Sequence, residues 1–407
     1  MRKYNVIDLF SGCGGLLDGF LQSGLYNHLA SVEWEKAPVN TLRKRLGNKY
    51  GIKNADKSVI LFDMQRTSEL LNGFSDDKYG ENPGLLKLVG EKELDFIIGG
   101  PPCQAYSVAG RVSVDQKEKA DYRNYLFEYY LKIVSTFKPK LFVFENVPGM
   151  LSAMPDGTPI IELIKRDINE VGYEIISDIR KFAILNTSDF GVPQSRKRVI
   201  LLGLSKEYFK KYDIQRLLEH FYVDLLNAEK VKKKKTVREA IGDLPGCYPL
   251  FSDKSPSHTT PTTNVTWQIP RFNSVRDVQI FRMLEEDLAS GKNEYTDSEK
   301  LKELYNKVTG AHTSVHKYHV LRPDEPSTTI LAHLYKDGLR FIHYDPEQAR
   351  CITVREAARL QSFDDDFDFV GSQGDAFKMI GNAVPPKFAL VLSKAIDRLM
   401  KEVNVNV

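Results

Sequence analysis

The sequence contains few cysteines and no long apolar run. Its four cysteines, Cys13, Cys103, Cys247 and Cys351, include no CxxC pair, so neither a disulfide framework nor a zinc site is predicted. No apolar run approaches the roughly 18 residues of a membrane-spanning helix. Asp8 interrupts the first apolar run too early for a secretory signal. We therefore expect a cytoplasmic protein with no membrane segment.

The sequence also has no large excess of positive or negative charge. Lys and Arg number 57 against 54 Asp and Glu, for a formal net charge of +3, and so small a total identifies no partner. A hydrophobic content of 42% and a charged content of 27% are typical of a globular protein. Because 407 residues exceed the usual length of one domain, we expect two lobes.

The N-terminal half alternates short apolar runs with amphipathic segments. Helical spacing is present over Tyr122 to Phe137 and over Pro159 to Val171. This alternation predicts an α/β fold with a Rossmann-like parallel sheet covered by helices. The runs expected to form buried strands are Val6 to Phe10, Ala30 to Val32, Val59 to Phe62, Phe96 to Ile98, Leu141 to Phe144 and Val199 to Leu204.

The alternation stops at about Ser205, and a polar stretch rich in Thr, Pro and Lys follows up to about Leu321. We expect this stretch to form the second lobe, with helices over Ile280 to Ala289 and over Glu299 to Val308. Capping boxes are predicted at Thr236 and Thr353. The last helix should return to the first lobe, because it carries one apolar face: Phe388, Val391, Leu392, Ala395, Ile396 and Leu399.

A glycine-rich turn, Asp8-Leu-Phe-Ser-Gly-Cys-Gly-Gly15, joins the first strand to a helix. Such a turn brings backbone amides close to a ligand. Glu33 ends the next strand, where it can accept hydrogen bonds from ribose hydroxyls, and Asp63 follows a third strand. Together they favour a cofactor that contains adenosine. The turn departs from GxGxxG, and a tight turn that binds nothing is the alternative.

Cys103 lies in Gly99-Gly-Pro-Pro-Cys-Gln-Ala-Tyr-Ser107, directly after a strand. Open α/β sheets keep their active sites at that end of a strand, which favours a nucleophile. A free thiol has a pKa near 8.5 and would need activation. A turn with a spectator cysteine is the alternative.

Glu145 ends a very apolar strand at the same edge of the sheet, where its carboxyl group could donate or share a proton. Alternation along the extended segment Gln194-Ser-Arg-Lys-Arg198 would put Arg196 and Arg198 on one side, able to hold a phosphate or a carbonyl oxygen. A basic strand entrance without a ligand is the other interpretation.

In order along the chain, these stretches closely resemble the DNA (cytosine-5) methyltransferase family, of the bacterial restriction-modification type. The resemblance spans Asp8 to Pro386 and excludes most of the polar lobe. Its motifs are Asp8 to Gly15, Glu33-Trp34, Asp63, Pro-Pro-Cys-Gln, Glu145-Asn-Val147, Gln-x-Arg-x-Arg, Thr353 to Phe363 and Gly381-Asn-Ala-Val384.

The resemblance implies that Cys103, Glu145, Arg198 and Arg196 are catalytic. Cys103 would add to C6 of a cytosine flipped out of the duplex, and Glu145 would hold or protonate N3. Arg198 would contact the base carbonyl, while Arg196 and Ser107 would contact phosphate. The methyl donor would be S-adenosyl-L-methionine, at the matching positions Phe10, Gly12, Gly14, Glu33, Trp34, Asp63, Leu126, Asn382 and Val384.

The resemblance also implies three parts: a catalytic domain over 1–203, a target-recognition domain with a supporting segment over 204–365, and a C-terminal return over 366–407. Within the lysine run Lys230 to Lys235, Lys232 and Lys233 are candidate DNA contacts, with a solvated loop as the alternative. The expected partner is double-stranded DNA. We expect a monomer without metal that protects DNA from a cognate restriction endonuclease. Solitary methylation, with no nuclease partner, is the alternative.

Two other functions stay open. One is a tRNA cytosine-5 methyltransferase on the same fold, although Ala105-Tyr106-Ser107 and the long polar lobe favour DNA. The other is a DNA-binding regulator without activity, against which the intact Cys103, Glu145, Arg196 and Arg198 argue. The recognition sequence does not follow from the chain, because the polar lobe carries no transferable base code.

Overall fold

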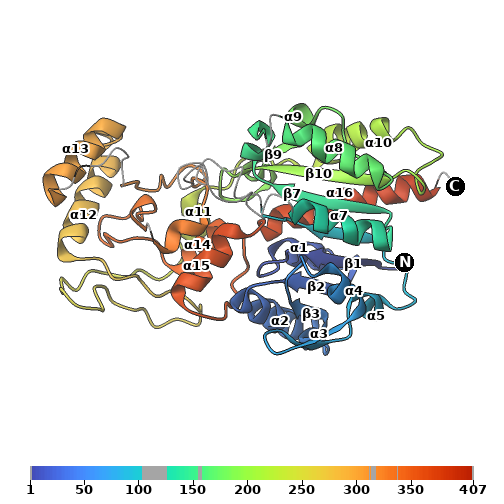
Figure 1. Cartoon of the computed structure of the whole chain (residues 1–407). Coiled ribbons are helices and arrows are strands. Elements are labelled where there is room, and N and C mark those ends of the chain that lie inside the picture. The colour runs from blue at the N-terminus through green and yellow to red at the C-terminus, as the bar shows by residue number, and fades with distance from the viewer. Residues whose placement is uncertain are drawn as a thin grey trace. The chain divides into compact units, whose positions relative to one another are not determined.

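The chain divides into two compact units in the computed structural model, which describes residues 2–102, 126–154, 158–310, 312, 318–336 and 338–405. Figure 1 shows their helices and strands along the chain. Unit 1 comprises Met1–Phe190, Lys197–Val231 and Ala383–Val407, and unit 2 comprises Gly191–Arg196 and Lys232–Asn382. The C-terminal segment therefore belongs to the same unit as the N-terminal half.

Unit 1 is built on an eight-stranded sheet, in the order β3-β2-β1-β6-β7-β10-β8, with β9 paired to β10. The predicted α/β class is confirmed, and every apolar run named above lies in or overlaps a strand. A small hairpin of β4 (Phe74–Asp76) and β5 (Gly80–Asn82) stands apart. The strands are β1 (Tyr4–Leu9), β2 (Tyr26–Glu33), β3 (Val59–Leu61), β6 (Phe96–Gly99), β7 (Leu141–Asn146), β8 (Tyr173–Glu174), β9 (Ile184–Asn186) and β10 (Lys197–Ser205).

The sheet is mixed, which corrects the prediction of a parallel sheet. Strands β3, β2, β1, β6 and β7 run parallel, but β10 is antiparallel to β7, β8 and β9. A strand buried on both faces is a continuous apolar run in either direction. The direction of β10 could therefore not be predicted from the sequence. The short strands β8 and β9 were not predicted either.

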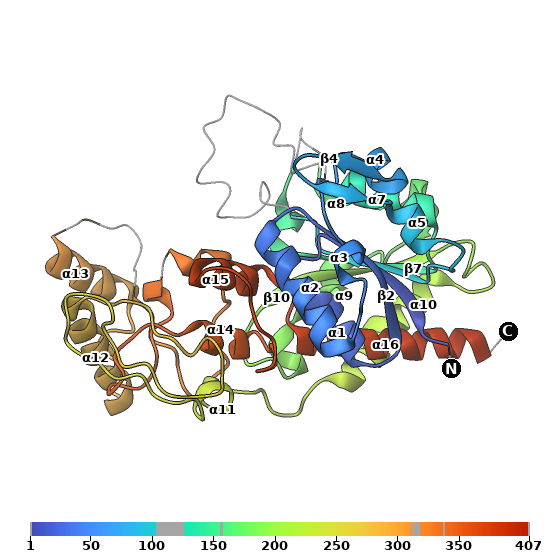
Figure 2. The ribbon, with the colours of Figure 1, turned by 90° about the horizontal axis from the view of Figure 1, so that it is seen from below.

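Helices cover the sheet of unit 1, and the described part of each predicted helix is helical. Figure 2 shows α16 beside α1, and a Cβ atom on Gly19 of α1 would lie 2.5 Å from that of Ala389. The apolar face predicted for α16 is buried, so the C-terminus packs on the first lobe as expected. The helices are α1 (Gly15–Gln22), α2 (Lys36–Tyr50), α3 (Ala55–Ser58), α4 (Thr67–Asn72), α5 (Leu85–Val89), α7 (Leu126–Phe137), α8 (Ile160–Glu170), α9 (Ile179–Phe182), α10 (Ile214–His220) and α16 (Pro386–Val405).

Unit 2 consists of short and medium-length helices joined by long irregular segments. Both predicted capping boxes are present, at Thr236 and Thr353, and the two predicted helices correspond to α12 and α13. No group of His, Cys, Asp and Glu within the described ranges could hold a metal ion, and none of the helices in those ranges is long and apolar enough to cross a membrane. The helices of unit 2 are α11 (Val237–Ile241), α12 (Val275–Ser290), α13 (Ser298–Thr309), α14 (Val354–Leu360) and α15 (Gln373–Asn382).

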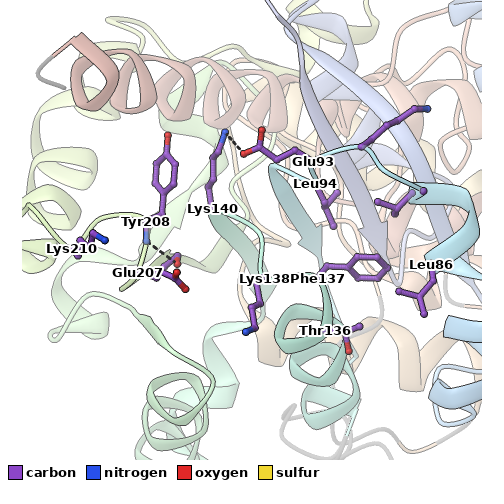
Figure 3. Close-up of a pocket in the computed structure, with 14 residues that line it drawn as sticks. Leu86, Glu93, Leu94, Thr136, Phe137, Lys138, Lys140, Glu207, Tyr208 and Lys210 are labelled. Atoms are coloured by element: carbon purple, nitrogen blue, oxygen red, sulfur yellow. Dashed lines mark hydrogen bonds and ion pairs between the residues drawn. The ribbon is translucent and has the colours of Figure 1, made fainter.

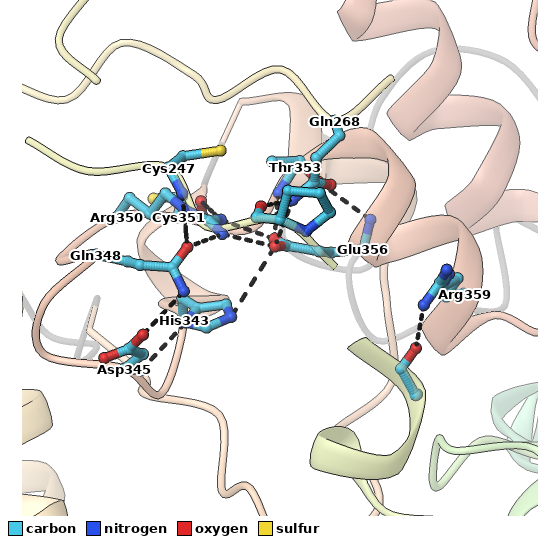
Figure 4. A network of polar contacts seen from close by, with 12 residues as sticks. Cys247, Gln268, His343, Asp345, Gln348, Arg350, Cys351, Thr353, Glu356 and Arg359 are labelled. Carbon is cyan, nitrogen blue, oxygen red and sulfur yellow. Dashed lines mark hydrogen bonds and ion pairs between the residues drawn. The ribbon is translucent and has the colours of Figure 1, made fainter. Parts of the chain in front are cut away.

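Unit 2 contains a buried ion pair between Arg350 and Glu356 (Figure 4). The Arg350 Nη2 to Glu356 Oε1 distance is 2.6 Å, and both side chains are 1% exposed. Burial raises the pKa of Glu356, but the Arg350 guanidinium outweighs that effect and holds the pKa at about 2. Because removing one partner would leave the other charge buried and unpaired, this pair is a rigid support for the segments bonded to it.

Glu285 of α12 is fully buried, and neither of its carboxyl oxygens has a hydrogen-bond partner in the described part of the chain. Burial raises the pKa of Glu285 to about 9, although the nearby Arg350 lowers it. The side chain is therefore protonated at neutral pH, when an unfolded chain would have released that proton.

We expect Glu285→Gln to stabilise the protein increasingly as the pH rises from 6 to 8.5. Because the pKa of Glu285 is higher in the folded protein than in the unfolded chain, the folded state keeps a proton that the unfolded chain releases. The free energy of unfolding therefore falls as the pH rises from the unfolded pKa of 4.5 to about 9. The slope is about 1.4 kcal/mol per pH unit for one group. Thermal unfolding at several pH values measures it. Glu286→Gln, at an exposed position of the same helix, is the control, and equal pH profiles for the two variants would contradict the prediction.

Candidate active site

The predicted reaction residues of unit 1 lie at one edge of its sheet. Parallel pairing places Leu9 opposite Gly99 and Gly99 opposite Phe144, so β1, β6 and β7 end together. Because β10 is antiparallel, its first residues pair with the last residues of β7, as Val199 does with Asn146. The ends of three strands and the start of a fourth therefore meet where open α/β sheets bind ligands.

Glu145 and Arg198 form an ion pair at this edge. The Arg198 Nε to Glu145 Oε1 distance is 2.9 Å, and each side chain is 11% exposed. Burial lowers the pKa of Arg198, and the carboxylate offsets part of that change. The guanidinium stays a cation at neutral pH. The structure thus brings together a carboxylate and a cation that the sequence placed 53 positions apart, both partly open to a ligand.

The loop toward Cys103 is held by residues without a predicted role. A Cβ atom on Gly100 would lie 2.8 Å from Glu145 Oε2, so glycine at this position lets the carboxylate lie close to the backbone. Asn146 donates from Nδ2 to the carbonyl oxygen of Pro101 at 3.1 Å. Asn146 is thus a positioning residue for the chain two residues before Cys103. Cys103 and Ser107 themselves lie outside the described residues.

The glycine turn after β1 leaves the extended conformation at Phe10, Gly12 and Gly14, whose φ angles are +57°, +53° and +88°. A left-handed phenylalanine is strained, and such strain gathers at ligand sites. In the described part of the chain, apart from the two adjacent residues, no heavy atom lies within 4 Å of the place where a Cβ on Gly12 would stand, whereas one on Gly14 would meet Leu42 at 2.4 Å. The turn is open at Gly12 and packed at Gly14.

Glu33 holds this turn to the end of β2. Its carboxylate accepts hydrogen bonds from the backbone N–H groups of Gly12 (2.9 Å), Trp34 (2.8 Å) and Glu35 (3.0 Å). Burial raises the pKa of Glu33, and these donors lower it. Since each carboxylate oxygen accepts more than one hydrogen bond, room for a ribose hydroxyl remains. Trp34 beside it is 57% exposed, which leaves its ring open to a planar ligand.

Asp8, the first residue of this motif, has a carboxyl group that is unbonded in the described part of the chain. Both oxygens are buried and lack hydrogen-bond partners. Burial, with the nearby Glu33, raises the pKa of Asp8 well above its usual range. No role was predicted for Asp8 beyond starting the motif. The structure therefore buries this carboxyl group near the end of β1, just before the glycine turn, and burial favours its protonated form.

The remaining cofactor candidates occupy different parts of the chain. Asp63 follows β3 and accepts a hydrogen bond from the Gln65 backbone N–H at 3.0 Å. Leu126 is buried at the start of α7. Asn382 is an exposed residue at the end of α15 in unit 2, and Val384 is buried just before α16 in unit 1.

Arg196 is placed differently from the phosphate contact that we expected. It is 2% exposed and donates to the carbonyl oxygens of Ile330 (2.8 Å) and Gly381 (2.9 Å) within unit 2. Gln194 bonds beside it to the Ile330 N–H and to Gln361. This geometry gives Arg196 a structural role, because it holds the last turn of α15, which ends at Asn382. Arg198, two residues further on, is instead paired with Glu145.

We expect Arg196→Ala to lower the stability of the protein by about 3 kcal/mol, because two buried carbonyl groups lose a charged donor. Thermal unfolding measures the change. Arg238→Ala, which removes an exposed ion pair with Asp324, is the control and should cost less than about 1 kcal/mol. A phosphate contact would instead leave unfolding unchanged and reduce the salt dependence of DNA binding.

The lysine candidates lie in unit 2, before α11. Lys232 and Lys233 are exposed, and Lys233 forms an ion pair with Glu239 at 3.0 Å. An exposed pair of this kind is weak. The geometry therefore leaves both interpretations of the run, phosphate binding and a solvated loop, in place.

A cavity of about 660 Å³ lies at the opposite edge of the sheet (Figure 3). Its lining includes Leu94, just before β6, Lys140, just before β7, and Ser205, the last residue of β10. Lys140 points toward Glu93 in the close-up and is paired with it. Since these are the far ends of the strands that carry Glu145 and Arg198, the cavity is separate from the candidate active site.

The comparisons with known proteins agree on one family. The sequence model for C-5 cytosine-specific DNA methylases matches residues 4–398. The type II methyltransferase M.Bpa9945I of Bacillus paralicheniformis is 32% identical, over 96% of this chain and 98% of its own. M1.HphI, a type II methyltransferase of Haemophilus parahaemolyticus, is 30% identical over 97% and 86%.

Solved structures agree with this assignment. A candidate DNA modification methyltransferase encoded within a prophage (E. coli) is 25% identical, with a TM-score of 0.62, covering 98% of this chain and all of the other. The Dnmt2 methyltransferase of S. pombe shares the fold at 16% identity, with a TM-score of 0.56 and coverage of 99% and 100%. Motifs, sheet and comparisons together establish that this chain is a DNA methyltransferase and belongs to the C-5 cytosine-specific DNA methylase family.

Proposed function

We propose that this enzyme transfers the methyl group of S-adenosyl-L-methionine to C5 of a cytosine flipped out of duplex DNA, through a covalent bond between Cys103 and C6. The observation that carries this proposal is the partly open Glu145–Arg198 ion pair, at the sheet edge to which the segment before Cys103 leads. A carboxyl group and a fixed cation are the groups that an activated pyrimidine ring needs.

The chain's own residues account for the activation of the base. The Cys103 thiolate forms a bond to C6, and the electrons of the C5–C6 double bond move toward N3 and the carbonyl oxygen. Glu145 holds a proton at N3, while Arg198 stabilises the negative charge on the carbonyl oxygen. C5 then takes the methyl group, loses its proton to a base, and the C6–S bond breaks to restore the ring.

The three cysteines that the structure describes do not compete with Cys103 for this role. Cys13, Cys247 and Cys351 are all buried. Burial raises the pKa of each thiol, to about 11 for Cys247 and Cys351. A thiol in such a setting is inert at neutral pH, which supports Cys103 as the nucleophile.

The residues at the end of β1 and β2 fit S-adenosyl-L-methionine. The open turn at Gly12 gives access to the backbone, the buried Glu33 carboxylate can accept from ribose hydroxyls, and the exposed Trp34 ring can contact adenine. When bound, the cofactor supplies an electrophilic methyl group. Phe10, Gly14, Asp63, Leu126, Asn382 and Val384 complete the proposed set.

We further propose that the enzyme is the modification enzyme of a restriction-modification system, acting as a monomer beside an endonuclease that cuts the same sequence. The type II names of the relatives support this role. Target recognition is proposed for 204–365, which includes most of unit 2, and the catalytic role for 1–203 with the return over 366–407. Lys232 and Lys233 are proposed phosphate contacts.

Labelled S-adenosyl-L-methionine, incubated with the enzyme and either duplex DNA or tRNA, tests the proposal. We expect label in DNA only. Label confined to tRNA would overturn the choice of substrate, and label in neither, with intact DNA binding, would indicate a regulator. Bisulfite sequencing of DNA from cells that express the protein would then give the methylated sequence.

A further inference from the structure

One stretch of unit 2, residues 244–275, almost lacks charge. Its 32 residues include only Asp253, Lys254 and Arg271, whereas 27% of the whole chain is charged. A segment at a protein surface usually carries more charge than this. We call these residues the low-charge segment, and its composition indicates a surface that contacts something other than water.

Apolar side chains of this segment are exposed. Tyr248, Leu250, Phe251, Ile269 and Phe272 are 47% to 54% exposed. Exposed neutral polar side chains lie between them in the sequence, at Thr259, Thr260, Thr262, Asn264 and Thr266. The segment therefore offers apolar contacts, hydroxyl groups and an amide, and beside it the Arg282 guanidinium of α12 lies 5.5 Å from the centroid of the Phe251 ring.

The low-charge segment is held rigidly from its buried side. The Cys247 N–H donates to Gln348 Oε1 at 3.0 Å, and His258 Nε2 bonds to the Gln348 carbonyl oxygen at 3.0 Å. Further along, Gln268 donates from Nε2 to Glu356 Oε1 at 3.2 Å. Figure 4 shows Cys247 and Gln268 at the Arg350–Glu356 network.

Such anchoring gives the exposed side chains a fixed base. Cys247 and His258, at the two ends of this turn, are buried, and Tyr248 and Leu250 between them are exposed. Pro249 pairs with His258 in an antiparallel bridge. A preformed surface loses little conformational entropy when it binds, which favours a role in recognition.

The chemistry of this surface fits base edges rather than phosphates. Base edges in the major groove present donors, acceptors and the thymine methyl group, but no charge. Phosphates are bound mainly by Lys, Arg and backbone amides. Since the substrate is DNA and the paired reaction residues lie in unit 1, a neutral binding surface in unit 2 is available for the sequence around the target.

We infer that Tyr248, Leu250 and Phe251 contact base edges of the target duplex and determine which sequence is methylated. This inference rests on the proposed function. It assigns base reading to the low-charge segment and leaves phosphate binding to residues such as Lys232 and Lys233.

The test compares the double variant Leu250→Ser/Phe251→Ser with wild type, on the duplex that bisulfite sequencing identifies. We expect kcat/KM on that duplex to fall at least about 10-fold, the effect of a lost base contact. Binding to a non-target duplex, and its salt dependence, should stay unchanged. Both positions are exposed, so thermal unfolding should match wild type. Val223→Ser, at a comparably exposed apolar residue of unit 1, is the matched control and should leave all these values unchanged.

A second variant, Lys232→Gln/Lys233→Gln, should do the opposite, weakening binding to both duplexes and reducing the salt slope. The inference is overturned if Leu250→Ser/Phe251→Ser methylates the target like wild type, or if it changes the salt slope instead. It is also overturned if sedimentation shows that wild type is a dimer and that the double variant dissociates it, since the surface would then bind a second copy. If wild type methylates no duplex, the proposed function fails, whatever the variant does.

Discussion

Replacing Cys103 by serine should reduce methyl transfer to DNA by about 10³-fold or more. The hydroxyl of serine is far less ionised than a thiol at neutral pH, so addition to C6, on which every later step depends, does not occur. Transfer of labelled methyl groups to duplex DNA measures the loss. Binding of the duplex should persist, because the substitution changes one atom.

The covalent intermediate gives a second measurement on the same variant. Duplex DNA containing 5-fluorocytosine should trap wild type as an adduct stable in denaturant, because fluorine at C5 blocks the final loss of a proton. Cys103→Ser should form no adduct. Cys351→Ser, which alters a buried thiol far from ionisation, is the matched control and should be trapped like wild type. An adduct with Cys103→Ser would show that another residue is the nucleophile.

Replacing Glu145 by glutamine should lower kcat by about 10² to 10³-fold, the usual effect of losing a positioned acid or charge stabiliser. Glutamine keeps the shape of the side chain but cannot hold the proton at N3. It also leaves Arg198 without the carboxylate that stands 2.9 Å from its Nε. Single-turnover methyl transfer on the target duplex measures the effect on chemistry directly.

Glu128→Gln, at an exposed position of α7, provides the control for Glu145→Gln and should behave as wild type. Cofactor binding by Glu145→Gln, measured by calorimetry, should also be retained, because Glu145 lies in β7, whereas the glycine turn of the proposed cofactor site follows β1. A rate for Glu145→Gln within threefold of wild type would mean that the ion pair is structural only.

The candidate reaction and cofactor residues, and their order along the chain, could be predicted from the sequence because each motif is local. A strand followed by a glycine turn, a strand that ends in Glu33 and a strand that carries Glu145 next to its last residue each depend on a few neighbouring residues. Buried strands are apolar runs, and the periodicity of α16 predicted its buried face. The class of fold, the family and the candidate reaction residues could therefore be predicted from local patterns of residues alone.

The pairing of these residues could not be predicted in that way. Arg196 and Arg198 are two positions apart in a basic segment, yet one is buried against the carbonyl oxygens of Ile330 and Gly381 and the other is paired with Glu145. Nothing in the local pattern separates them. The difference arises because each guanidinium meets segments more than fifty residues away in sequence.

Short-range patterns of residues specify the alternation of strands and helices, the family and the residue types at the strand ends, because such patterns encode burial and turn geometry. Three features come instead from the folded arrangement: the antiparallel direction of β10, the pairing of Glu145 with Arg198, and the anchoring of the low-charge segment on Gln348 and Glu356. These features depend on contacts between segments that are distant in the sequence. An apolar run or a single charged residue does not by itself indicate which segment it will contact.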